Sequence, residues 1–175
     1  MQEGLTSRLT KLLLIPLFLG LCGHLSASES SGLDSEASVK YLDEIKTLYL
    51  TTDERQALLS HSNALLDTYG LKAAYQVGQA SPEDLMYQLS LGVPGELRIR
   101  EERRSETGNM AVRNRSYSMF GVDPYVSYRC PAQGVMCVFD APGGAEPWII
   151  ILRDPKGAEE LAKALSFLIR YIQKG

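Results

Sequence analysis

The sequence contains few residues of the kinds that bind metals or carry redox chemistry. It holds three cysteines and two histidines among 175 residues. Beyond residues 1–27 only Cys130, Cys137 and His61 remain. A zinc site needs about four nitrogen or sulfur ligands, and the two cysteines are too far apart for the C-x-x-C pattern of a redox motif. We therefore expect no metal site, no thioredoxin-like chemistry and no cofactor.

Catalytic motifs are also absent from the sequence. It has no G-x-S-x-G, no H-E-x-x-H and no phosphate-binding P-loop. His61 falls within a predicted helix, with Leu58 and Leu65 beside it at helical spacing, which is typical of a half-buried structural residue. We expect no catalytic residue and a non-enzymatic protein. A hydrolase built around Asp140, Asp154 and the arginines is the alternative from another class of function.

The sequence shows no excess of positive charge and no second long apolar run. Eighteen basic residues against 21 acidic ones give a net charge of −3 at pH 7. A protein that binds nucleic acid in bulk needs a strongly basic domain, and a transmembrane helix needs about 20 apolar residues. We expect no nucleic-acid partner, and no transmembrane helix once the N-terminal segment has been removed.

The N-terminal segment has the pattern of a signal peptide. Arg8 and Lys11 precede "LLLIPLFLGL", residues 12–21. This apolar run of about ten residues has the length of a signal-peptide core and is too short to span a bilayer. Small and polar residues follow it, and Ala27 suits the last position before cleavage. The pattern predicts a signal peptide over residues 1–27.

Export would place the remaining chain in a secreted or periplasmic location. The polar residues 28–36 are predicted to form a flexible lead-in to the folded part. Two alternatives are an uncleaved anchor and a lipoprotein acylated on Cys22. The second is disfavoured because Leu21 stands where a lipoprotein has a small residue.

Hydrophobic periodicity divides the rest of the chain into a helical part and a strand-rich part. Apolar residues at spacings of three and four, with helix-start signals, predict helices over residues 37–50, 52–69 and 82–91. Alternating patterns such as "ELRIRE" predict about five antiparallel strands, and "PWIIILR" is apolar enough to be buried on both faces. A long helix over 155–173 follows its cap, Asp154. We predict a single α+β domain over 37–175, helical over 37–92, with the sheet and the last helix over 95–175.

The two remaining cysteines are predicted to form a disulfide. An exported chain meets an oxidising compartment, where two cysteines form a bond. A hairpin that turns on Gln133 and Gly134 would place Cys130 directly opposite Cys137. Opposed residues in an antiparallel pair have Cα atoms about 4.5 to 5.5 Å apart, which a disulfide can bridge. The alternative is a pair of reduced, buried cysteines.

Arginines alternate along the first two predicted strands. Arg98 and Arg100 share one face of the first strand, and Arg113 and Arg115 share one face of the second. If the strands pair, the four guanidinium groups are expected on one sheet face, where they would bind an anionic ligand or an acidic protein partner. The alternative is a solvated face that protects the edge strand and is neutralised by nearby glutamates: Glu96, Glu101, Glu102 and Glu106.

The order of elements in the C-terminal half resembles the end of a pleckstrin-homology-like domain. Antiparallel strands, the apolar strand "PWIIILR" and the capped helix "DPKGAEELAKALSFLIRYI" carry this resemblance, which covers residues 95–173. It implies a bent sheet closed at one corner by a C-terminal helix. It also implies a binding module for phosphoinositides, peptides or protein surfaces.

Together these patterns predict an exported, non-enzymatic α+β binding protein of unknown ligand. The alternatives are a periplasmic immunity-type inhibitor of an exported toxin, the hydrolase described above and a lipid-anchored envelope protein. The sequence contains no motif that chooses among the possible ligands.

Overall fold

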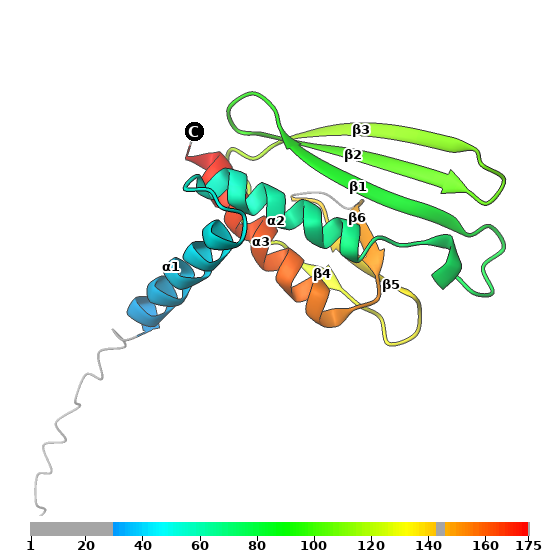
Figure 1. Cartoon of the computed structure of the whole chain (residues 1–175), viewed down its shortest axis with the longest axis horizontal. Coiled ribbons are helices and arrows are strands. Elements are labelled where there is room, and N and C mark those ends of the chain that lie inside the picture. The colour runs from blue at the N-terminus through cyan, green and yellow to red at the C-terminus, as the bar shows by residue number, and fades with distance from the viewer. Residues whose placement is uncertain (1–29, 143–145, 175) are drawn as a thin grey trace, which may run out of the picture.

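A computed structural model describes residues 30–142 and 146–174 of the chain. The predicted signal peptide over residues 1–27 and the alternative acylation site Cys22 lie outside the described residues. Within the described ranges, three α-helices and a short 3₁₀ helix combine with two antiparallel sheets of three strands each (Figure 1). The chain is therefore an α+β protein, as the sequence predicts, but with two small sheets in place of one sheet of about five strands.

The helices and strands have the following bounds. The helices are α1 (Ser30–Leu48), α2 (Glu54–Thr68), η1 (Ala73–Tyr75) and α3 (Pro155–Gln173). The first sheet contains β1 (Glu83–Leu91), β2 (Glu96–Ser105) and β3 (Met110–Ser118) in that order, and the second contains β4 (Tyr128–Arg129), β5 (Met136–Asp140) and β6 (Pro147–Leu152).

The predicted helix over 82–91 is wrong, because this segment is strand β1. Its residues alternate between buried Leu85, Tyr87 and Leu89 and exposed side chains between them. This period of two belongs to a strand with one buried face. The segment "SPED", residues 81–84, is typical of a helix start but instead leads into the strand, and its last two residues belong to β1.

The other helices follow the prediction more closely. Helix α3 spans the predicted residues, and the side chain of Asp154 accepts a hydrogen bond of 2.8 Å from the backbone N–H of Gly157. Helix α2 begins two residues later than predicted, at Glu54, and the side chain of Asp53 caps it. Helix α1 begins at Ser30, so the predicted flexible lead-in is helical from that residue onward.

A short segment after α2 joins the two sheets. Gly70 forms an antiparallel bridge with Ile151 of β6, and Leu71 forms one with Leu85 of β1. A Cβ atom at Gly70 would lie 3.3 Å from the carbonyl oxygen of Leu66 in α2, so the end of this helix leaves little room for a side chain there. Gly70 directly follows Tyr69, the C-terminal cap of α2, and it has no positive φ angle.

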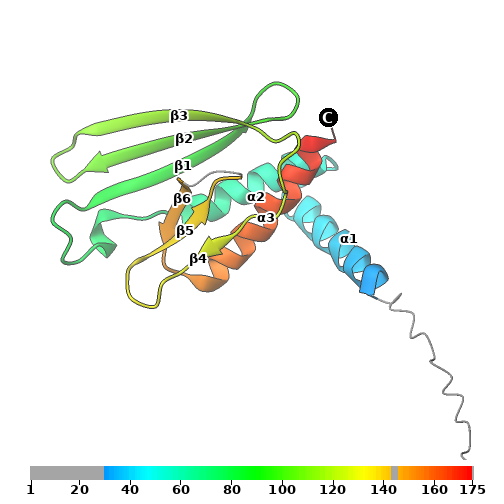
Figure 2. The same ribbon diagram turned by 180° about the vertical axis from the view of Figure 1, so that it is seen from behind.

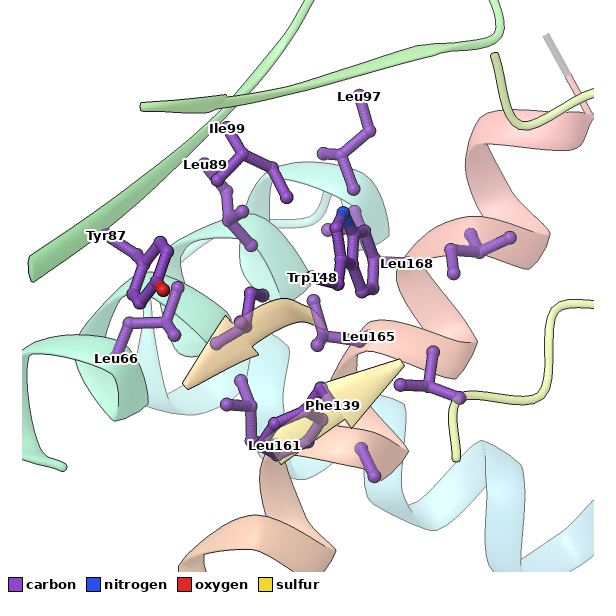
Figure 3. Close-up of a cluster of buried hydrophobic side chains, with 14 of the residues drawn as sticks. Leu66, Tyr87, Leu89, Leu97, Ile99, Phe139, Trp148, Leu161, Leu165 and Leu168 are labelled. Atoms are coloured by element: carbon purple, nitrogen blue, oxygen red, sulfur yellow. The ribbon is translucent and has the colours of Figure 1, made fainter. Parts of the chain in front are cut away.

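The core lies between the first sheet and helix α3. Trp148 of β6 is fully buried, with Leu97 of β2 on one side and Leu165 and Leu168 of α3 on the other (Figure 3). Figure 2 shows the second sheet against the helices, while the first sheet extends past them toward its β2–β3 turn. Trp148 therefore anchors the core.

Candidate functional site: the arginines of the first sheet

The register of the first sheet separates the four predicted arginines. Arg98 and Arg100 stand opposite Ser116 and Asn114, whereas Arg113 and Arg115 stand opposite Glu101 and Ile99. Because directly opposed residues share a face, each pair of arginines lies on a different side of the sheet. The prediction of one face with four guanidinium groups is therefore wrong. Alternation within each strand was visible in the sequence, but the relative phase of two strands depends on the turn that joins them.

The outer face of the sheet is neutralised by neighbouring carboxylates. Arg98 donates two hydrogen bonds of 3.1 Å to Glu96, and Arg100 forms an ion pair with Glu102. The hydrogen bonds from Arg98, together with those from Ser116 and the backbone of Val93, lower the pKa of Glu96 to about 2. On this face the arginines form the solvated, paired arrangement that the sequence offered as the alternative.

The inner face contains a buried carboxylate with two arginines bound to it. Glu101 is only 4% exposed, and its two oxygens accept hydrogen bonds from Arg103 (2.7 Å) and Arg115 (3.0 Å). Such charge-assisted bonds satisfy a carboxylate that would be costly to bury alone. Arg103 belongs to β2, which continues as far as Ser105 although the alternation of apolar and charged residues ends at Glu101.

Arg115 also connects the two sheets. Its guanidinium group donates a hydrogen bond of 2.7 Å to the carbonyl oxygen of Trp148 and one of 3.3 Å to that of Pro147. Both acceptors belong to β6, so Arg115 holds β3 against the core strand of the second sheet. Its contacts indicate a structural role and leave little of its charge for a ligand.

Tyr87 of β1 stands opposite Glu101 on the inner face and is also buried. Burial, followed by the nearby charge of Glu101, raises the pKa of its phenol well above the usual value. Two further donors there, Nε of Arg115 and Nε1 of Trp148, are buried and have no hydrogen-bond partner among the described residues.

Arg113 differs from its neighbours because it has no ion pair within the described part of the chain. It stands directly opposite Glu101, but both oxygens of that carboxylate are already bound by Arg103 and Arg115. Three arginines thus share the inner face with one buried carboxylate, and the third has its charge available. Arg113 is exposed, so it can reach a ligand from solvent.

The helices carry a second polar cluster, centred on His61. Its Nδ1 atom lies 3.3 Å from the hydroxyl of Tyr49, and its Nε2 atom lies 3.1 Å from Oε1 of Glu160. The hydroxyl of Tyr41 donates to the same Glu160 oxygen at 2.9 Å. Burial and this hydrogen bond raise the pKa of Tyr41 above the usual value. The cluster therefore joins α1, α2 and α3.

The His61 cluster contains no nucleophile in reach of the imidazole. The hydroxyl of Ser60 accepts a hydrogen bond from Gln56, and the hydroxyl of Ser62 is buried without a partner among the described residues. Adjacent residues of a helix point to different sides. The arrangement supports a structural role, in which the cluster fixes α1 to the body of the protein.

The acidic residues of the alternative hydrolase have structural partners. Asp140 forms an ion pair of 2.6 Å with Arg129, and Asp154 caps α3. Among the described residues, neither carboxylate forms an ion pair or hydrogen bond with the other or with an inner-face arginine. The residues described contain no group of three or more His, Cys, Asp or Glu that could hold a metal ion.

The predicted disulfide is confirmed. Cys130 and Cys137 are bonded, with Cα atoms 4.2 Å apart, and the pairing of Arg129 with Val138 continues toward them. Arg153 closes the hairpin, because its N–H donates to Val135 and its side chain donates to Pro131, both at 2.8 Å. The disulfide stabilises the turn between β4 and β5.

No family model, curated protein or solved structure matches the chain. In the ranges that the structure describes, none of the helices has the length and apolar character needed to cross a membrane.

Proposed function

We propose that this chain is an exported, non-enzymatic binding protein and that its ligand binds at strand β3. The observation that carries the proposal is the exposure of this strand. None of the nine residues of β3 is buried, and Arg113 on it has no ion pair in the described ranges. Burial of apolar surface is what normally stabilises a sheet, so β3 adds little to the core while it presents charge and apolar groups to solvent.

The disulfide supports the location in this proposal. Disulfides persist mainly in oxidising compartments such as the periplasm and the extracellular space, and the N-terminal sequence has the pattern of an export signal. The intact mass of the protein purified from its native envelope tests this part. We expect cleavage after Ala27 and the loss of two protons at Cys130 and Cys137. A mature chain that still begins at Met1 would contradict export, and added lipid mass on Cys22 would support the lipid-anchored alternative.

The binding part is tested by affinity capture from the native envelope with two single variants. Arg113→Ala removes the unpaired charge on the inner face. Arg104→Ala is the matched control, because Arg104 is an exposed arginine of the same hairpin on the outer face, also without an ion pair in the described ranges. We expect Arg113→Ala to lose a stoichiometric partner that Arg104→Ala retains. If both variants captured the partner equally well, Arg113 would not be part of the binding site.

The narrower predictions are part of the same proposal. The resemblance to a pleckstrin-homology-like domain is supported by the order of β6 and α3 and by the packing of α3 on the core. An immunity-type inhibitor is a special case of the binding protein, in which the captured partner is an exported toxin. The hydrolase is disfavoured, because Asp140 and Asp154 already have structural partners.

A further inference from the structure

We propose that β3 binds its partner by strand addition, and that the partner contributes an extended segment in which acidic and apolar residues alternate. This inference rests on the proposed function, and it names the chemistry of the partner. It requires three features of β3: free backbone groups along one edge, a regular strand, and side chains that select one kind of segment.

The hydrogen-bond pattern shows which backbone groups of β3 are free. The N–H of Ser105 donates to the carbonyl of Asn109 at 2.9 Å, and the N–H of Met119 donates to that of Gly95 at 2.7 Å. Backbone groups of a strand point alternately to its two sides, so the odd-numbered residues of β3 face β2. The N–H and C=O groups of Val112, Asn114 and Ser116 therefore point away from β2.

These outward groups form an open edge. β3 is the last strand of its sheet, and in Figures 1 and 2 it borders the molecule on that side. The described residues supply no hydrogen-bond partner for the outward backbone groups. β3 contains no proline, and its register with β2 has no bulge. Protein sheets block such an edge with a proline, a bulge or charged side chains. β3 has only the third device, two arginines of the same sign, so it is suited to receive a strand of opposite charge.

The side chains of β3 argue against a second copy of this chain as the partner. The strand contains Arg113 and Arg115 but no acidic residue. An antiparallel pair of copies centred on Asn114 would place Arg113 of one copy opposite Arg115 of the other, and like charges directly opposed are destabilising. Other registers would leave the arginines without an opposing carboxylate.

The same side chains select an acidic segment. On the inner face, an Asp or Glu of the added strand opposite Arg113 would meet a guanidinium group that the chain itself leaves without an ion pair. On the outer face, Met110 is 58% exposed and Val112 is 41% exposed, so they can contact apolar residues of the segment. Because neighbouring residues of a strand point to opposite faces, the matching segment alternates acidic with apolar residues.

The test uses a labelled synthetic peptide of the same length as β3 in which Glu and Val alternate, with Lys–Val and Gln–Val peptides as charge controls. Binding to the full mature chain is measured by fluorescence anisotropy. We expect the Glu–Val peptide to bind more tightly than the Gln–Val peptide, and the Lys–Val peptide to bind least. Arg113→Glu should weaken the Glu–Val complex about tenfold or more, as for other close charge pairs, and should favour the Lys–Val peptide.

Two further variants separate strand addition from a simple charge effect. Asn114→Pro removes an N–H that points away from β2, so it should abolish binding while circular dichroism shows a folded chain. Lys156→Glu makes the same change of charge at an exposed position in the first turn of α3, where a carboxylate is favourable, and should leave binding unchanged. Equal affinity of the wild type and Asn114→Pro would overturn the proposal.

Amide hydrogen exchange measured by NMR locates the bound peptide. We expect the peptide to slow exchange at Val112, Asn114 and Ser116, whose N–H groups are open in the free protein. Slowing confined to another surface, peptide-induced pairing of two copies, or no binding would overturn strand addition. So would Arg113-dependent binding of inorganic phosphate or anionic vesicles that Asn114→Pro leaves intact. An envelope partner captured through Arg113 but insensitive to Asn114→Pro would retain the proposed function and reject only this mode of binding.

Discussion

Both sheets of this protein are antiparallel, but strand β6 of the second sheet and strand β3 of the first differ in how far their side chains are buried. In β6, Trp148, Ile149 and Ile151 are all fully buried, so both faces of the strand are covered. In β3 no side chain is buried. The second sheet is tied by a disulfide and packed on α3, whereas β2 and β3 extend beyond the core (Figure 1). The comparison shows that β6 belongs to the core, together with the buried side chains of β1 and β2, whereas β3 can change its exposed side chains at little cost in stability.

Removal of the core anchor gives the largest expected effect. Trp148→Ala should lower the free energy of unfolding by about 3 to 5 kcal/mol, because it deletes a fully buried aromatic side chain. The matched change on the other sheet, Val112→Ala, should cost less than about 0.5 kcal/mol. Urea denaturation followed by circular dichroism measures both, since Trp148 is the only tryptophan and its fluorescence is lost in the variant. Similar losses of unfolding free energy in the two variants would contradict the conclusion that β6 belongs to the core and β3 does not.

Removal of the disulfide gives the next largest effect. The double variant Cys130→Ala with Cys137→Ala should lose about 2 to 3 kcal/mol of stability, because the unfolded chain is no longer closed into a loop. Part of the loss reflects the small cavity left at Cys137, which is fully buried. Thermal unfolding of the wild type in a reducing agent is the control that separates the bond from the cavity. An unchanged melting temperature in both samples would contradict the structural role of the bond.

The buried ion pairs of Glu101 should contribute more to the stability of the first sheet than the exposed ion pair of Glu102. Glu101→Gln leaves Arg103 and Arg115 without their carboxylate and should cost about 2 kcal/mol, less than for a fully buried pair because the side chain of Arg103 is 48% exposed and screened by solvent. Glu102→Gln on the outer face is the control, with an expected cost under about 0.5 kcal/mol. Chemical denaturation of both variants measures the difference, and equal costs would show that the buried cluster does not join the sheets.

Alkaline pH should destabilise the fold through Tyr41 and Tyr87. The pKa of each phenol is raised in the folded chain, chiefly by burial, from an ordinary value of 10.0. Their contribution to stability is complete below pH 10 and is lost as the pH rises, since the unfolded chain releases these protons first. We expect a loss of about 1 kcal/mol per tyrosine for each pH unit above 10. Tyr41→Phe should reduce this slope, and a slope equal to that of the wild type would contradict the assignment.

The smallest effect is expected at the proposed binding residue. Arg113→Ala should change the free energy of unfolding by less than about 0.5 kcal/mol, because Arg113 is exposed and has no ion pair within the described residues. The same denaturation experiment measures it and serves as the folding control for the binding tests. A loss comparable to that of Glu101→Gln would show that Arg113 belongs to the structural cluster.

Much of the fold could be predicted from local patterns. The cap at Asp154 predicted α3 correctly, and a turn on Gln133 and Gly134 predicted the disulfide hairpin. The failure at β1 has a physical cause. The start signal "SPED" is a local preference, whereas the alternation of Leu85, Tyr87 and Leu89 is rewarded only when a partner strand and a core are present.

The sequence by itself determined the elements whose residues interact with near neighbours along the chain, such as the capped helix α3 and the cysteine hairpin, because helix caps and short loops depend on local spacing. Only the tertiary structure decided which arginines share a face of the sheet and which groups they bind. The register between β2 and β3 placed Arg113 and Arg115 on the inner face, and the packing of β6 engaged Arg115 with Trp148 and Pro147. Arg113 was left without an ion pair in the described ranges because Arg103, on the same strand as Glu101, and Arg115, on the partner strand, had already bound both oxygens of that carboxylate.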